Sequence, residues 1–360
     1  MVFEVARTGS SESLIYVRHD VLIGGVTMWY GRYRFSLILE DDALLPEYKG
    51  STFRGIFGHA LKKVVCALKR QDCADCLLKE KCVYSLVFET SSIGISEPPP
   101  GAGSPPENAL TGGRLRKRIA VPPHPYVIEP PDDTRTLYRK GEALDFTLLL
   151  FGHVNEYLPY FIYAFTEMGT LGIGKRVGEN RATFILDKVI SGERLVYDSR
   201  AGKMSAGSFA EELDVRPFSS EALCSRVSIR LLTPLRIKFE NHFKAELPFH
   251  VLTRAMLRRV SALYQYYGDG EPALDYRGLV GRAKTIVTES ATIRWFDWKR
   301  YSNRQDQSML MGGMMGEVTF AGELNEFIPL IRFCEKLHLG KQTAFGLGKI
   351  HLALPEGGST

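Results

Sequence analysis

A short motif occurs twice in this 360-residue chain, each time at the start of an expected helix. The first copy reads Asn-Glu-Tyr-Leu-Pro from Asn155, and the second reads Asn-Glu-Phe-Ile-Pro from Asn325, 170 positions later. Each copy follows an expected strand and precedes a loop rich in glycine and basic residues, which leads into another strand. Because the flanking elements repeat together with the motif, we infer an internal duplication.

The hydrophobic patterns on both sides of the motif support this duplication. Each half reads strand, helix, strand or hairpin, strand, helix, strand, which is the order of a ferredoxin-like βαββαβ unit. We therefore predict an α+β protein with tandem duplicated ferredoxin-like, RRM-like domains, one over residues 1–210 and one over 211–360. The expected strands lie at 31–39, 143–151, 182–189, 226–238 and 317–320, with helices at 52–68, 155–168, 247–264 and from 325.

Composition places few limits on function. The content of hydrophobic residues (44%) and charged residues (24%) is that of a soluble globular protein. A net charge of +5 permits an acidic partner such as nucleic acid. The opening segment MVFEVARTGS lacks the apolar core of a signal peptide, and the longest apolar run, near 144–151, is too short to span a bilayer. We expect a cytoplasmic protein with no membrane partner.

Four of the six cysteines crowd into residues 66–82 with the spacing C-x6-C-x2-C-x5-C. Thiolates this close in sequence can converge on a tetrahedral ion, so the pattern predicts a cysteine-rich insertion that binds structural Zn²⁺. Four free thiols or an iron–sulfur cluster are the alternatives. The expected ligands are Cys66, Cys73, Cys76 and Cys82.

A segment at 91–123 is too rich in Pro, Gly and Ser to pack a core, and we expect a flexible loop. It carries four basic residues between 114 and 118. Such a cluster is usually a solvated surface, but beside a phosphate-binding surface it would contact a nucleic-acid backbone.

The glycine-rich loop near the end of the chain reads GKQTAFGLGKI over 340–350. Glycine lets backbone N–H groups approach a ligand closely, and the two lysines add positive charge, so the loop suits a phosphate. A plain hairpin before the last strand is the alternative. The candidate phosphate-binding residues are Gly340, Lys341, Gln342, Thr343, Gly346, Gly348 and Lys349.

Two further segments combine features of nucleic-acid binding. Aromatic and basic residues alternate over 294–304, a combination that stacks unpaired bases and neutralises phosphates, although a strand with one buried face gives the same pattern. In the helix at 247–264, Arg254 and Arg258 stand one turn apart. They either line the groove between the two domains or are ordinary solvated residues. The candidates in the first segment are Trp295, Trp298, Arg300 and Arg304.

One helix carries a candidate acid–base group. In the helix at 52–68 the apolar stripe faces the core, and His59 and Lys63 lie one turn apart on the opposite face. A solvated histidine or a further zinc ligand would give the same pattern.

Several motifs, in their order, resemble the RAMP superfamily of CRISPR-associated proteins. The order is similar to that in the branch that processes CRISPR repeat RNA, the sixth Cas protein family. The resemblance covers nearly the whole chain. The motifs are FRGIFGHAL (53–61) with the four cysteines and VYSLVFE (83–89), LTPLRIK (232–238), WFDWKRYSNRQ (295–305), MGGMMGEVTF (311–320) and HLGKQTAFGLGKI (338–350).

This resemblance implies an endoribonuclease that cuts precursor CRISPR RNA within each repeat and needs no metal or other cofactor for catalysis. A 2′-hydroxyl attacks the neighbouring phosphate, which leaves a 2′,3′-cyclic phosphate and a 5′-hydroxyl. Many members use a histidine on the first helix, and His59 occupies that place here. Tyr48 and Lys63 are candidate partners, and His338 is either a rival catalytic group or a contact of the glycine-rich loop or the RNA.

Two other functions compete with this one. Some RAMP proteins line the RNA of CRISPR effector complexes without cutting it, so a non-catalytic RNA-binding subunit is the main alternative. Repeat RNA is the expected partner in both cases, with effector subunits as further partners. A mononucleotide-binding protein is disfavoured, because the chain has no G-x-x-x-x-G-K-[ST] loop and neither glycine-rich loop opens a helix.

Overall fold

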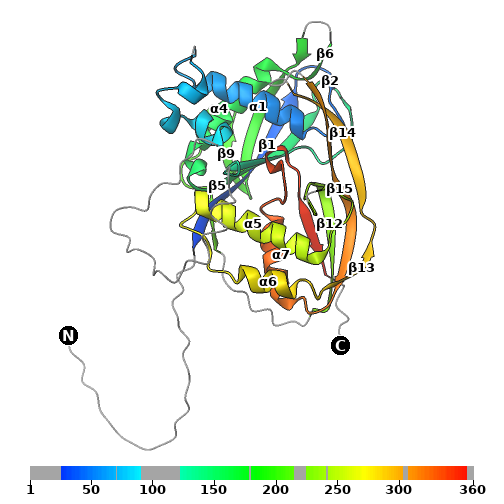
Figure 1. Ribbon diagram of the computed structural model, residues 1–360. Coiled ribbons are helices and arrows are strands. Elements are labelled where there is room, and N and C mark those ends of the chain that lie inside the picture. The colour runs from blue at the N-terminus through cyan, green and yellow to red at the C-terminus, as the bar shows by residue number, and fades with distance from the viewer. Residues whose placement is uncertain are drawn as a thin grey trace, which may run out of the picture.

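The computed structural model describes residues 26–69, 71–90, 122–177, 180–214, 224–240, 242–302 and 307–354, and every structural statement below concerns these. The flexible loop expected at 91–123 and its basic cluster lie almost entirely outside them. The described chain forms two large sheets that are each flanked by helices (Figure 1), together with two small sheets of two strands each.

The first sheet has the strand order of a ferredoxin-like unit. Its central four strands run β8-β1-β5-β3, all antiparallel, and one helix follows β1 and another follows β5. In chain order this is the 4-1-3-2 arrangement that a βαββαβ unit adopts. The elements are β1 (Thr27–Leu39), α1 (Gly50–Val65), β3 (Tyr126–Glu129), β5 (Ala143–Phe151), α4 (Leu158–Leu171) and β8 (Phe184–Ser191).

The second sheet repeats this arrangement. Its order is β16-β12-β15-β13, again antiparallel, and β14 forms a long hairpin with β15. The predicted α+β fold with two similar halves is therefore found. The elements are β12 (Arg226–Leu235), α5 (Phe249–Tyr267), β13 (Val287–Ala291), β14 (Arg294–Ser302), β15 (Gln307–Ala321), α7 (Ile328–Glu335) and β16 (Ile350–Ala353).

The repeated motif adopts the same local structure in both halves. In each copy the Asn-Glu-aromatic segment ends a short 3-10 turn, at Tyr157 and at Phe327, and the α-helix begins at the next residue. Proline then occupies the first turn of the helix, where its missing N–H group costs nothing. The two helices therefore start later than expected, but at equivalent positions.

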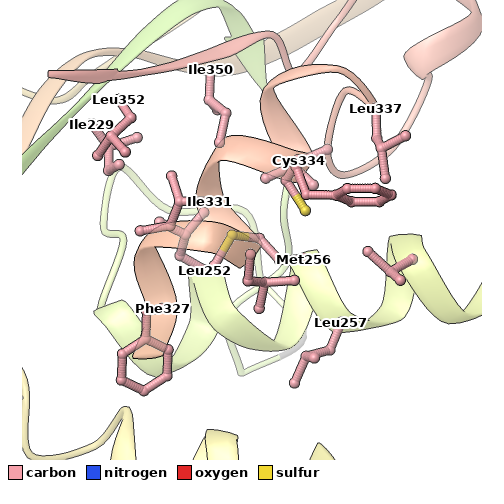
Figure 2. Packing of buried hydrophobic residues seen from close by; sticks show 14 of the residues in the cluster. Ile229, Leu252, Met256, Leu257, Phe327, Ile331, Cys334, Leu337, Ile350 and Leu352 are labelled. Atoms are coloured by element: carbon pink, nitrogen blue, oxygen red, sulfur yellow. The ribbon is translucent and has the colours of Figure 1, made fainter. Parts of the chain in front are cut away.

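The side chains of β1 connect the two halves. Phe35 and Leu37 face α1 and α4 and belong to the core of the first half. Met28 and Tyr30 lie on the opposite face and belong to the same core as α5 and α7. Because strand residues alternate between faces, one sheet can serve both cores. Figure 2 shows α5 and α7 packed together beneath residues of β12 and β16.

The remaining elements lie outside the two ferredoxin-like units. The first glycine-rich loop, after α4, differs from the expected open loop because it contains a hairpin of β6 and β7. β11 pairs with β1 in the first sheet, just beyond the boundary predicted at residue 210, and that boundary remains a prediction. These elements are β2 (Ala43–Leu44), α2 (Val83–Phe88), β4 (Leu137–Tyr138), β6 (Ile173–Val177), β7 (Asn180–Ala182), β9 (Arg194–Asp198), β10 (Lys203–Met204), β11 (Glu211–Asp214) and α6 (Tyr276–Arg282).

Within the described residues, no helix combines the length and the apolar character that a membrane span needs.

Candidate functional site

The candidate catalytic histidine lies on the solvent face of α1. Phe53, Phe57 and Leu61 bury the other face of this helix, so the helical period places His59 outside the core. Its side chain is exposed, and within the described chain it has no hydrogen-bond or ion-pair partner. Both ring nitrogens are therefore free to form hydrogen bonds with a ligand.

Lys63 stands one turn beyond His59 on the same exposed face. Its ammonium group forms a 2.8 Å ion pair with Glu167 of α4. Because the lysine side chain is more than half exposed, this ion pair contributes little to stability. Lys63 can therefore exchange Glu167 for another anion.

Tyr48 does not approach His59. It precedes α1, whereas His59 lies about 14 Å along the helix axis from Gly50. The phenol donates a 2.6 Å hydrogen bond to the carbonyl oxygen of Phe345 in the glycine-rich loop, and burial raises the pKa of Tyr48. The predicted grouping of Tyr48 with His59 and Lys63 is therefore not formed, because Tyr48 belongs to the contact between the two halves.

His338 is completely buried, also at the contact between the two halves. Its Nδ1 lies 3.0 Å from the carbonyl oxygen of Leu347, and its Nε2 lies 2.9 Å from a carboxylate oxygen of Glu129 on β3. The carbonyl oxygen of Leu347 can only accept, so Nδ1 donates that hydrogen bond and Nε2 faces the carboxyl group of Glu129. His338 was expected to be either a catalytic group or a contact of the glycine-rich loop or the RNA. The structure shows the contact with the loop.

Glu129 joins several basic groups, and sequence analysis missed it. Besides His338, it forms ion pairs with Lys349 at 2.9 Å and with Arg32 at 3.5 Å. Burial alone would raise the pKa of Glu129, but the hydrogen bonds and charges of His338 and Lys349 together hold it at about 2. The sequence signal was a carboxylate on the otherwise apolar strand YVIE.

The glycine-rich loop is wedged between the halves rather than open to solvent. It contacts α1 and β3, and a Cβ atom added at Gly346 would lie 2.5 Å from the carbonyl oxygen of Ile128. Thr343, Gly346 and Gly348 are buried. Several of the loop's N–H groups already donate to acceptors within the protein, namely those of Lys341, Phe345, Gly346, Gly348 and Lys349.

The loop that was expected to bind phosphate is therefore mostly closed to a ligand. Its glycines instead allow the backbones of the two halves to pack closely. Gly340 and Lys341 remain exposed, and Gln342 is half-buried. The surface that the loop offers to a ligand is thus confined to its first residues, and the ammonium group of Lys349 is directed to Glu129.

The aromatic and basic residues of β14 divide between two environments. The Trp298 ring packs 5.0 Å from that of Tyr48, while the Trp295 ring lies 6.0 Å from that of Phe243 and donates its N–H to Asp297. Arg300 lies in β14, but its side chain is outside the described part of the structure, and Arg304 is outside it entirely. On α5, Arg254 and Arg258 are both exposed, one turn apart.

The predicted zinc site is not supported. Cys66 ends α1, whereas Cys73, Cys76 and Cys82 adjoin two short 3-10 turns, and all four thiols are free. Across the described ranges, no three His, Cys, Asp or Glu side chains are grouped so that they could hold a metal ion. In this part of the structure the donors therefore do not fit the expected ion.

Comparison with known protein families accounts for both halves. Residues 229–350 match the family described as CRISPR-associated endoribonuclease Cas6. Residues 28–208, half of the chain, match the family AF_1859_N, described as an N-terminal domain. The chain belongs to the AF_1859_N family, and its second half is similar to CRISPR-associated endoribonuclease Cas6. The match to Cas6 confirms the resemblance noted in the motifs, and the antiparallel sheets with their helices confirm the mixed α and β class of the fold.

The individual relatives are distant from the chain in sequence. An uncharacterized protein of Archaeoglobus fulgidus is 27% identical over 227 residues, which is 63% of this chain and 66%, just under two thirds, of that relative. A partial complex described as Cas6-RT-Cas1–Cas2 superposes with a TM-score of 0.52 at 12% identity, over 91% of this chain and 46% of the other. That superposition supports the shared fold.

A Thermus thermophilus Cas6 structure is also similar, with a TM-score of 0.47 and 12% identity over 91% of this chain and 99% of the other.

Proposed function

We propose that this protein is an endoribonuclease that cleaves CRISPR repeat RNA and that His59 is its catalytic acid or base. The observation that carries the proposal is the match of residues 229–350 to the Cas6 family, in a chain whose first helix presents an exposed, unpartnered histidine. Exposure matters because the scissile phosphate of a long RNA must reach the catalytic group.

The proposed reaction needs a proton donor, a proton acceptor and positive charge. The 2′-oxygen loses its proton and attacks the adjacent phosphorus, while the bond between phosphorus and the 5′-oxygen breaks and that oxygen gains a proton. The products are a 2′,3′-cyclic phosphate and a 5′-hydroxyl. Imidazole can carry out either proton transfer near neutral pH. No step requires a metal ion.

Lys63 is proposed to stabilise the charge of the pentacovalent phosphorane. Its ammonium group is near His59 and is held by a mostly exposed ion pair that an RNA phosphate can displace. Tyr48 and His338 are proposed to act indirectly, by holding the glycine-rich loop between the two halves. This assignment follows from their hydrogen bonds to Phe345 and Leu347.

The test is a cleavage assay in EDTA on a labelled RNA that contains two repeats from the same genome. We expect the wild type to cut once per repeat and to leave a cyclic phosphate, while His59→Ala binds the RNA but cuts at least about a hundredfold more slowly. His153→Ala is the matched control, because His153 is also exposed but lies in the turn before α4. Equal cleavage by His59→Ala and the wild type would contradict the assignment.

A non-catalytic RNA-binding subunit of a CRISPR effector complex is the second candidate. It is favoured by the isolation of His59, since neither Tyr48 nor His338 approaches it. Wild-type protein that binds the two-repeat RNA and never cuts it, with or without Mg²⁺, would support this candidate. Binding to effector subunits and a cytoplasmic location remain predictions in either case.

A further inference from the structure

A half-buried phenylalanine on the second half is surrounded by positive charge. Phe243 lies in the segment between β12 and α5. Its ring centre is 4.2 Å from the guanidinium carbon of Arg236, 5.6 Å from Nζ of Lys238 and 6.0 Å from Nζ of Lys341. The cations come from the segment after β12 and from the start of the glycine-rich loop, so the tertiary fold brings them together.

Acidic residues do not neutralise this cluster. In the described part of the chain, Lys238 and Lys341 form no ion pair and are exposed. Arg236 donates to the carbonyl oxygen of Gly312 at 2.8 Å. The carboxylate of Asp297 accepts the indole N–H of Trp295 and lies near enough to Arg236 to offset one of the three positive charges. The cluster therefore carries a net positive charge that is available to an anion.

A second aromatic ring extends the cluster. The centroid of Trp295 on β14 lies 6.0 Å from that of Phe243, with 43° between the ring planes. The hydrogen bond to Asp297 sets the orientation of the indole. Trp295 is only partly buried, so Phe243 and Trp295 form one aromatic surface that is bordered by cations.

We propose that Phe243 and Trp295, with Arg236, Lys238 and Lys341, bind an unpaired RNA nucleotide. The base would stack on the aromatic surface, and the three cations would contact the flanking phosphates. Single-stranded nucleic-acid sites combine these two features, because every base has a flat face and every linkage has a charge. An acidic peptide would use the cations but has no need of the rings, so RNA is the favoured partner.

This inference rests on the proposed function in that its ligand is RNA, but it does not require cleavage. The probe is therefore a fluorescent 2′-O-methyl oligouridylate, which lacks the attacking hydroxyl. A second probe has the same backbone with abasic sugars in place of the nucleosides. Binding of each is measured by fluorescence anisotropy at several salt concentrations.

We expect Phe243→Ala to weaken binding of the oligouridylate about five- to a hundredfold and binding of the abasic probe less than about twofold. Lys238→Gln should weaken both probes and lower the salt dependence by about one unit of slope. Tyr163→Ala is the matched control, because Tyr163 is 55% exposed on α4, far from the cluster in sequence. It should leave both affinities unchanged.

Phe243→Trp separates stacking from folding, since it keeps an aromatic surface and should retain at least about half of the affinity. Loss of affinity in Phe243→Trp, or an equal effect of Phe243→Ala on both probes, would overturn the proposal. Binding of a polyglutamate peptide with the same dependence on Phe243 would also overturn it, in favour of an acidic protein partner. If the protein binds the oligouridylate but does not cleave repeat RNA, the proposed endoribonuclease function is contradicted and the proposed nucleotide-binding site stands.

Discussion

The phenol of Tyr48, directly before α1, donates a 2.6 Å hydrogen bond to the carbonyl oxygen of Phe345 in the glycine-rich loop, 297 positions later. Gly50 approaches the same carbonyl group so closely that a Cβ atom there would lie 2.0 Å from its oxygen. The start of the first helix and the glycine-rich loop therefore form one packed unit.

Tyr48→Phe should lower the free energy of unfolding by about 1–2 kcal/mol, because it removes the hydrogen bond from the buried phenol to the carbonyl oxygen of Phe345. Cleavage by the folded variant should stay within about threefold of the wild type, because the indirect role proposed for Tyr48 includes no proton transfer. Urea unfolding and the repeat-RNA assay measure the two effects. Tyr163→Phe, at an exposed position, is the control. A Tyr48→Phe variant that is as stable as the wild type but does not cleave RNA would contradict the indirect role and show that the phenol takes part in catalysis.

Gly346→Ala should destabilise the protein more than Gly141→Ala does. Both glycines have positive φ, +82° and +85°, so both variants bear the left-handed strain of about 1 kcal/mol. A Cβ atom at Gly141 meets open space, whereas one at Gly346 would lie 2.5 Å from the carbonyl oxygen of Ile128. We expect an additional loss of about 1–3 kcal/mol at Gly346 from this overlap, measured by urea unfolding. Equal losses would show that the loop is not wedged against β3.

The ion pairs of Glu129 should make stability depend on pH in the acid range. Its folded pKa of about 2 lies below the ordinary value of 4.5, so its contribution is complete above about pH 4.5 and is lost as pH falls toward 2. Between pH 7 and pH 3 this should cost roughly 2 kcal/mol.

Urea unfolding at a series of pH values measures this contribution. Glu129→Gln should be less stable than the wild type at pH 7, because His338 and Lys349 lose their partner, and the difference should shrink as the pH falls. A difference that does not change with pH would contradict the prediction.

Arg254→Gln and Arg258→Gln should each weaken RNA binding without changing stability, provided that the exposed face of α5 contacts phosphates. Each lost phosphate contact should lower the slope of log affinity against log salt by about 0.7–0.9. Arg332→Gln is the control, since Arg332 is an exposed arginine on α7 of the same half. Unchanged slopes would identify Arg254 and Arg258 as ordinary solvated residues.

The elements of the fold were largely readable from the sequence. The strand at 143–151 was predicted to the residue, and the repeated motif gave two equivalent helix starts. Alternation and helical period report which face of an element is buried, so the exposed position of His59 could also be predicted. The predicted zinc site was not supported, because the spacing of cysteines does not state where their thiols lie after folding.

Local sequence thus determined the type and order of the elements, and with them the duplicated architecture, because the periods of strands and helices are local properties. The tertiary structure alone decided which distant residues meet. It paired His338 with Glu129, joined Tyr48 to Phe345 and enclosed Phe243 in cations from separate segments. These contacts depend on how two sheets and their helices pack, and packing is a property of the whole chain.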